Sequence, residues 1–144
     1  MVGPQVGATG VARTEATGHH AGRVLVVCDE GRLTQMLAAI GEEEGYLVDT
    51  ISWRDEGLRE ALGQHQHLVM LDWVSPPLAA PLVNLIRREH ASTRIVVMIP
   101  SWSDLESGAR LAADLVLHKP LRVNQVRRVL AEVRPPARHV HSAA

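Results

Sequence analysis

Short, unbroken runs of apolar residues constrain this chain more than any other feature of its sequence. The clearest run is Leu68–Leu71, and Asp72 ends it. A run of this length without polar interruption is typical of a strand buried on both faces, as in the middle of a parallel sheet. Similar apolar runs predict strands at Val24–Val27, Ile95–Ile99 and Leu115–Leu117, and a further strand is predicted at Leu47–Ser52.

Stretches with a helical period separate these strands. The apolar residues of the first stretch recur at the spacing of one helix face, at Leu33, Met36, Leu37 and Ile40. Gly45 is expected to end this helix. Ser75-Pro76-Pro77 is predicted to be a rigid loop, because two prolines fix φ and remove two donors. Four more helices are predicted, at Asp55–Leu62, around Leu82–Ile86, from Asp104 to about Ala112, and at Val123–Val133.

Strand and helix alternate five times, with connections too long for hairpins. This alternation predicts an α/β fold, in which helices cover both faces of a five-stranded parallel sheet. Right-handed crossovers favour the flavodoxin-like, doubly wound strand order 2-1-3-4-5 with five helices. We predict one such domain at residues 23–133, between a flexible leader at residues 1–22 and a flexible tail at residues 134–144.

Composition excludes several classes of protein. A length of 144 residues suits one domain, and a net charge of -1 gives no electrostatic reason to expect nucleic acid or a membrane as partner. The single cysteine, Cys28, excludes an internal disulfide and a cysteine-based zinc site, and it fits a cytoplasmic protein. No apolar run approaches the roughly 20 residues that span a bilayer. The histidines are scattered along the sequence, so we expect no histidine metal site.

Charged residues follow three of the predicted strands where these strands end close together. The first strand is followed by Asp29 and Glu30, the third ends in Asp72, and the fifth leads into Lys119. Facing carboxylates repel unless a cation lies between them, and Mg²⁺ commonly binds one or two carboxylates. A nearby lysine would neutralise charge on a phosphoryl group. The pattern indicates transfer of a phosphoryl group onto a carboxylate, and the alternative is that Asp72 only caps a turn.

Three motifs occur in order on these strands, at Val26–Glu30, Leu71–Pro76 and His118–Pro120. Together they resemble the receiver domain of the response regulators of two-component signalling, over about residues 23–133. The resemblance implies a signalling protein that is no enzyme beyond self-catalysed phosphoryl transfer and autodephosphorylation.

The resemblance also implies a role for individual residues. Asp72 would be the phosphoacceptor and would bind Mg²⁺ together with Asp29, the main metal ligand. The backbone carbonyl of Val74 would be a further ligand. Lys119 would contact the phosphoryl oxygens, and the peptide bond between Lys119 and Pro120 would be cis.

The sequence departs from the family pattern at three positions. Cys28 stands where the family has the first acid of its pair, so Mg²⁺ should bind weakly or not at all unless Glu30 compensates. Ile99 stands where the fourth strand normally ends in Thr or Ser, and Ser101 is the nearest hydroxyl. Val116 occupies the usual aromatic switch position.

Two functional hypotheses follow. In the first, a single-domain receiver accepts a phosphoryl group on Asp72 from a histidine kinase or phosphotransfer protein and then binds a downstream protein. In the second, a degenerate receiver acts as an interaction module without phosphorylation, and Asp72 and Lys119 remain as a structural ion pair. The family implies a partner surface, or a homodimer interface, on the last two helices and the strand between them. Trp73 and Trp102 are candidates for a partner-binding rim beside the site.

Other uses of this fold match the sequence less well. A flavodoxin needs a phosphate-binding loop after the first strand, and the acids in Cys28-Asp29-Glu30-Gly31 would repel phosphate. A phosphatase of the haloacid dehalogenase type needs a second aspartate two residues after the first, but Asp72 is followed by Trp73 and Val74. Cys28 is expected to be a small buried residue rather than a redox sensor.

Overall fold

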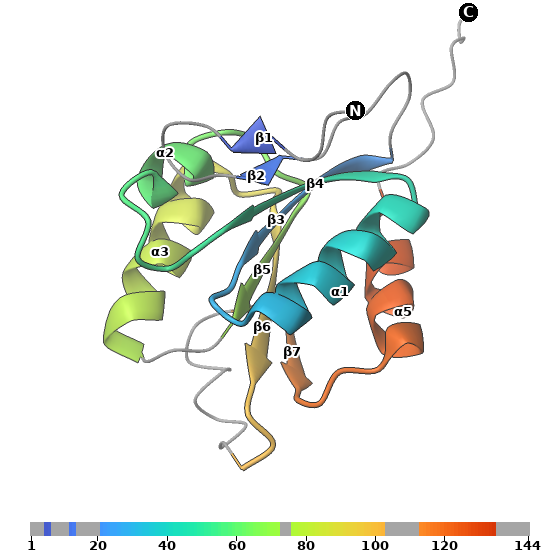
Figure 1. The fold of residues 1–144 in the computed structure, drawn as a ribbon. Coiled ribbons are helices and arrows are strands. Elements are labelled where there is room, and N and C mark those ends of the chain that lie inside the picture. The colour runs from blue at the N-terminus through green and yellow to red at the C-terminus, as the bar shows by residue number, and fades with distance from the viewer. Residues whose placement is uncertain (1–4, 7–11, 14–20, 73–75, 103–112, 135–144) are drawn as a thin grey trace, which may run out of the picture.

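The structure, a computed structural model, describes residues 5–6, 12–13, 21–72, 76–102 and 113–134 (Figure 1). Its sheet has the strand order β1-β2-β4-β3-β5-β6-β7, and every pairing from β4 to β7 is parallel. These five strands confirm the predicted order 2-1-3-4-5. Their bounds are β3 Gly22–Val27, β4 Tyr46–Ile51, β5 Leu68–Asp72, β6 Arg94–Ile99 and β7 Leu115–His118.

Two short strands extend the sheet beyond β4, which we had predicted to be its edge. β1 (Gln5–Val6) pairs antiparallel with β2 (Ala12–Arg13), and β2 pairs antiparallel with β4 through Ala12↔Thr50 and Arg13↔Asp49. The sequence predicts a flexible leader at residues 1–22, whereas the structure has these four residues in strands. An edge strand offers unpaired N–H and C=O groups, and a two-residue strand can bind them without any apolar period in its sequence.

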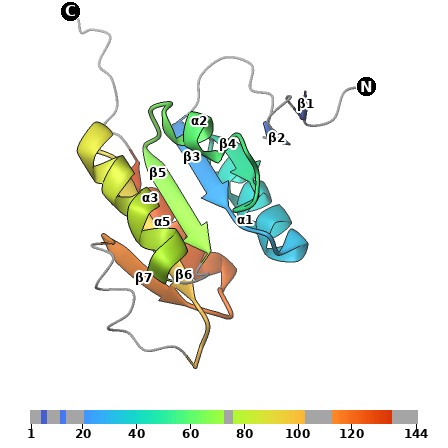
Figure 2. The same cartoon turned by 90° about the vertical axis from the view of Figure 1, so that its left-hand side faces the viewer.

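Helices cover both faces of the sheet. α1 (Gly31–Glu43) and α5 (Val123–Val133) lie on one face, and α2 (Leu58–Leu62) and α3 (Pro76–Glu89) lie on the other (Figures 1 and 2). The predicted helix at 104–112 and the tail at 135–144 lie outside the described residues. None of the described helices has both the length and the apolar character needed to cross a bilayer.

Two helix ends test the sequence-based expectations. Gly45 follows α1 with φ +90°, a conformation that favours glycine, so its predicted role as the end of this helix is confirmed. The prediction of a rigid loop at Ser75-Pro76-Pro77 is wrong in part, because α3 begins at Pro76. Proline is tolerated in the first turn of a helix, where its missing N–H would have no helical partner.

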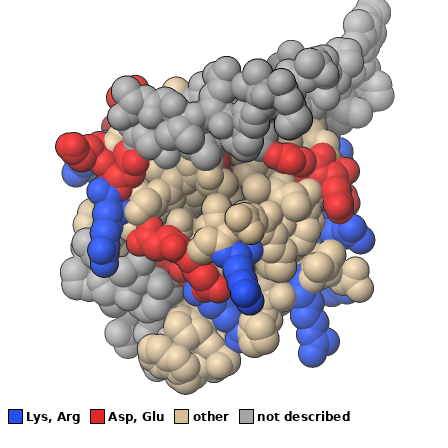
Figure 3. All heavy atoms as spheres, viewed as in Figure 1, with Lys and Arg blue, Asp and Glu red and all other residues tan. Residues whose placement is uncertain are grey.

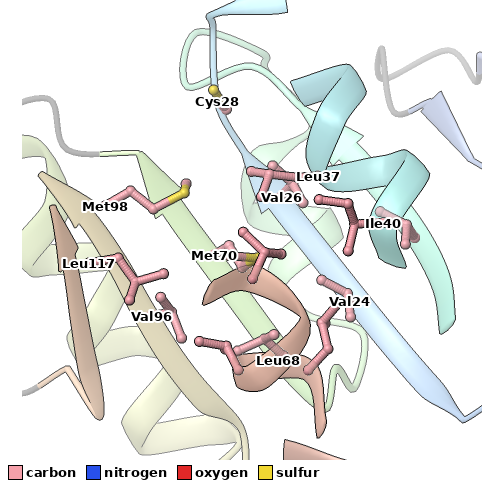
Figure 4. Close-up of a cluster of buried hydrophobic side chains, with 14 of the residues drawn as sticks. Val24, Val26, Cys28, Leu37, Ile40, Leu68, Met70, Val96, Met98 and Leu117 are labelled. Atoms are coloured by element: carbon pink, nitrogen blue, oxygen red, sulfur yellow. The ribbon is translucent and has the colours of Figure 1, made fainter. Parts of the chain in front are cut away.

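The strands place alternate residues on opposite faces, and this alternation leads to the site. The core cluster beneath α1 and α5 contains Val24 and Val26 of β3, and Cys28 directly after that strand (Figure 4). It also contains Leu68 and Met70 of β5. Leu117 of β7 belongs to the same cluster. Continuing by two residues along β5 gives Asp72, and doing so from Leu117 gives Lys119. Cys28, Asp72 and Lys119 therefore follow the same face of the sheet to its carboxyl edge.

Candidate functional site

Asp72 and Lys119 meet at the carboxyl edge of the sheet. The Lys119 ammonium group forms an ion pair with Oδ1 of Asp72. Asp72 is only 9% exposed. β6 holds the backbone of Lys119, since its N–H donates a hydrogen bond of 2.8 Å to the carbonyl oxygen of Ile99. The bond between Lys119 and Pro120 is cis, as the resemblance implied. The structure thus brings together two of the predicted site residues, one acidic and one basic.

Cys28 contacts the other oxygen of the Asp72 carboxylate. Its Sγ lies 3.6 Å from Oδ2 of Asp72 and 3.6 Å from the carbonyl oxygen of Glu30. Burial raises the pKa of the Cys28 thiol, and the negative charge of Asp72 also raises it, while a hydrogen bond with Thr34 acts in the opposite direction. At neutral pH the group is therefore a neutral thiol that can donate a hydrogen bond to the Asp72 carboxylate.

Asp29 and Glu30 each have partners other than Asp72. The Asp29 carboxylate accepts a hydrogen bond of 3.1 Å from the backbone N–H of Trp53, in the segment after β4. It lines a groove whose described lining includes Thr34, Ser52 and Arg54 but not Asp72. Glu30 has a side chain that is 59% exposed, and its Oε1 lies 3.9 Å from Nζ of Lys119. The Asp29 carboxylate is thus held by a backbone N–H, and Glu30 lies beside Lys119.

The chemistry of these donors does not fit Mg²⁺. A hard cation needs oxygen ligands in an octahedral arrangement, whereas Cys28 presents a neutral thiol where the family has an acid. Both oxygens of Asp72 already have a donor beside them, namely Lys119 and Cys28. Within the described part of the chain, no three His, Cys, Asp or Glu side chains are grouped closely enough to hold a metal ion. Val74, whose carbonyl was the other expected ligand, lies outside that part.

The two substituted switch positions are apolar and packed. Ile99 is fully buried in the core cluster beneath α2 and α3, and Val116 packs against the same cluster. Ser101, the nearest hydroxyl in the sequence, is exposed. Neither Ile99 nor Val116 can offer a hydroxyl group to a phosphoryl group on Asp72, so the usual relay has no polar atom at these positions.

An open groove of about 480 Å³ lies beside Lys119. Apolar side chains from α1 and from the segments after β6 and β7 line it, with Trp102 83% exposed at its rim. The face that Figure 3 shows carries acidic and basic side chains close to one another, without a broad patch of one sign. The lining consists of Glu30, Arg32, Leu33, Met36, Pro100, Ser101, Trp102, Lys119, Pro120 and Leu121.

Sequence reasoning missed two features. The first is the contact between Cys28 and Asp72, which strand alternation could have indicated, because both residues end neighbouring strands on the same face. The second is a buried acid in β4, Asp49, which is 2% exposed and pairs with Arg23 at 3.2 Å. No motif marks Asp49, since its environment depends on how three strands pack.

Comparison with known proteins relates this geometry to a family. No protein-family model matches the chain. The nitrogen assimilation regulatory protein NtrX of Azorhizobium caulinodans is 30% identical over 110 residues, which are 72% of this chain and 24% of that protein. The response regulator ArlR of Staphylococcus aureus is 28% identical over 114 residues, which are 78% of this chain and 51% of ArlR. The chain contains a response-regulator receiver domain.

A solved structure agrees with this assignment. The beryllofluoride-activated receiver domain dimer of NtrC4 superposes with a TM-score of 0.65 and 27% identity, and the match covers 78% of this chain and 95% of that one. The chain spans about a quarter of the length of NtrX and about half that of ArlR. The similarity therefore concerns the receiver domain, and it supports a place in two-component signalling.

Proposed function

We propose that this receiver domain accepts a phosphoryl group on Asp72 from a histidine kinase or a phosphotransfer protein. The observation that supports the proposal is the ion pair between Asp72 and Lys119 at the carboxyl edge of the sheet. An oxygen of Asp72 would attack the phosphorus of a phosphohistidine, and the P–N bond would break as the acyl phosphate forms. The Lys119 ammonium group would neutralise the charge on the transferred group. Phosphorylated receiver would then bind a downstream protein.

The groove beside Lys119 supports docking of the phosphodonor at this end of the domain. Trp102 offers a large exposed apolar surface there, and exposed tryptophan is enriched where proteins bind each other. Replacement of Trp102 by alanine should slow transfer from a kinase while leaving reaction with a small phosphodonor unchanged. Transfer rates for the two donors, measured on the same variant, test this assignment. Equal slowing with both donors would contradict a docking role.

A second candidate function is a phosphorylation-independent interaction module. The contact of Cys28 with Asp72 favours it, because a thiol replaces an acid at the site. Apolar Ile99 and Val116 favour it as well, since a phosphoryl group would have no switch hydroxyl to bind. In this case Asp72 and Lys119 would stabilise the loops that a partner recognises.

The deciding experiment compares wild-type protein with Asp72→Asn. Each is incubated with acetyl phosphate and with a phosphorylated histidine kinase, and intact mass spectrometry records the addition of one phosphoryl group. We expect addition to wild type and none to Asp72→Asn. Asp49→Asn is the matched control, because it removes another buried acid far along the sheet and should still be labelled. No labelling of wild type by either donor, with partner binding unchanged in Asp72→Asn, would establish the second candidate.

Assembly is a separate part of the proposal. The NtrC4 receiver domain forms a dimer in its beryllofluoride-activated state. We propose that the last two helices of the fold, of which α5 is the one the structure describes, and the strand between them form the corresponding output surface, for a second copy or for a downstream protein. Light scattering before and after labelling of Asp72 tests for a dimer. A mass that stays monomeric would leave a different protein as the partner.

A further inference from the structure

We infer that the Cys28 thiol takes the place of a metal ligand, so that Asp72 is held between a thiol donor and an ammonium group and does not recruit Mg²⁺. This inference deepens the proposed function and depends on it only for the role of Asp72 as acceptor. It rests on the chemistry of the groups around the carboxylate.

The first step is the position of Cys28. The register aligns Val27 of β3 with Leu71 of β5, so the next residues, Cys28 and Asp72, end the two strands side by side. The backbone N–H of Cys28 donates to the carbonyl of Ile51 at 3.0 Å, which extends the pairing with β4 by one residue. Cys28 is only 5% exposed. Pairing of its backbone with β4 and burial of its side chain therefore hold the sulfur in place.

The second step concerns what the thiol presents to Asp72. A thiol is ordinarily protonated at neutral pH, and Cys28 is buried in an apolar cluster. A neutral thiol is a weak hydrogen-bond donor and a poor ligand for a hard cation. The Sγ atom of Cys28 lies 3.6 Å from Oδ2 of Asp72, and the Lys119 ammonium group contacts Oδ1. Each carboxylate oxygen therefore has a positive or hydrogen-bond-donating group beside it. The carboxylate thus has its charge compensated without a metal ion.

The third step concerns the other acids. The Asp29 carboxylate accepts a hydrogen bond from the N–H of Trp53 and lines a groove that Cys28 also lines. Glu30 lies near Lys119 with an exposed side chain. To bind Mg²⁺ next to Asp72, the site would have to turn Asp29 away from Trp53 and displace the thiol. Without that change, Asp72 would be the one carboxylate to carry most of the binding. The remaining acids therefore do not compensate for the cysteine.

The test is a titration with Mg²⁺ alone, in which binding is monitored by tryptophan fluorescence and by the change in melting temperature. Wild type and Cys28→Ser should show no saturable change at millimolar Mg²⁺. Cys28→Asp should bind Mg²⁺ at least about tenfold more tightly, because loss of even an outer partner of a metal site typically costs ten- to hundredfold in affinity. The double variant with Asp72→Asn should lose that binding.

Two outcomes would overturn the inference. One is saturable Mg²⁺ binding by wild type that Asp72→Asn abolishes, a result that needs no cysteine variant at all. The other is a folded Cys28→Asp, as judged by circular dichroism, that binds Mg²⁺ no better than Cys28→Ser. Labelling by acetyl phosphate with and without a chelator gives a second readout. It should be insensitive to the chelator in wild type and should become sensitive in Cys28→Asp.

These results separate the inference from the proposed function. If Asp72 is never labelled in any variant, the proposal of phosphotransfer is wrong, yet the Mg²⁺ titrations still decide what Cys28 does. If labelling occurs only with Mg²⁺ in wild type, phosphotransfer stands and the inference about Cys28 is wrong.

Discussion

Two buried acids in the same sheet, each paired with a base, occupy very different surroundings. Asp49 lies within β4 and pairs with Arg23 at 3.2 Å, and the same guanidinium group donates to Gln64 at 3.2 Å. Asp72 is the last residue of β5, and its partners are Lys119 and the thiol of Cys28. The exposed fractions are 2% for Asp49 and 9% for Asp72.

The difference shows that a buried ion pair does not by itself identify a reactive site. Arg23 is a planar, permanently charged partner that holds a carboxylate in one geometry, which suits a structural pair. Lys119 is a flexible point charge whose side chain is 24% exposed and borders an open groove. What distinguishes Asp72 is its place at the end of a strand, where loops meet and a second molecule has access.

Exchange of each acid for its amide should produce the largest and most contrasting effects. Asp72→Asn should abolish labelling but change stability little, because Lys119 can turn to water. Asp49→Asn should retain labelling but lower the free energy of unfolding by about 1–3 kcal/mol, since it leaves the partly buried Arg23 guanidinium group without its buried counter-charge. Urea unfolding and intact mass spectrometry measure the two quantities on the same samples.

Equal loss of stability in both variants would break this comparison. It would mean that Asp72 and Lys119 are chiefly a structural pair, as the second candidate function requires. Asp49→Ala provides a harsher control, because it also removes the amide as a hydrogen-bond acceptor and should destabilise the protein further.

Alkaline pH should reveal the thiol beside Asp72. Its pKa is raised above 9.0 in the folded protein, so its contribution to stability is fully present below pH 9.0 and is lost as the pH rises through the folded value. The loss amounts to about 1.4 kcal/mol for each pH unit that separates the folded and unfolded pKa values. Cys28→Ser should lack this loss. Unfolding midpoints below and above pH 9.0, measured for both proteins, test the prediction.

Tyr46 does not confuse this measurement. Its pKa is also raised, chiefly by burial, but it is the same in both proteins and cancels in their difference. A parallel decline of wild type and Cys28→Ser would show that the thiol ionises equally in the folded and unfolded chains. The account of a thiol whose pKa is raised by burial beside Asp72 would then be wrong.

The smallest effect is expected at an exposed ion pair. Arg127 of α5 lies 2.9 Å from Glu43 of α1, with side chains that are 47% and 60% exposed. Because water screens both charges, a double-mutant cycle with Arg127→Ala and Glu43→Ala should give a coupling of about 0.5 kcal/mol or less. A coupling as large as the effect at Asp49 would show that burial does not set the strength of these pairs.

Much of the site could be predicted from positions at strand ends. Asp72 ends an apolar run and Lys119 follows another, and parallel strands with this order bring such ends together. The start of α3 at Pro76 could not be predicted from the prolines alone, because they suit both a loop and a first helical turn. β1 and β2 could not be predicted either, since two-residue strands show no period.

By itself, the sequence determined which residues the sheet buries and which charged groups reach its carboxyl edge, because the apolar runs and their two-residue alternation dictate both. Only the tertiary structure decided where the polar atoms point. It turned the thiol of Cys28 toward Asp72 and the carboxylate of Asp29 toward Trp53, and it buried Asp49 beside Arg23. Such contacts depend on differences of a few tenths of an ångström in the separation of donor and acceptor atoms, and residue order does not specify these separations.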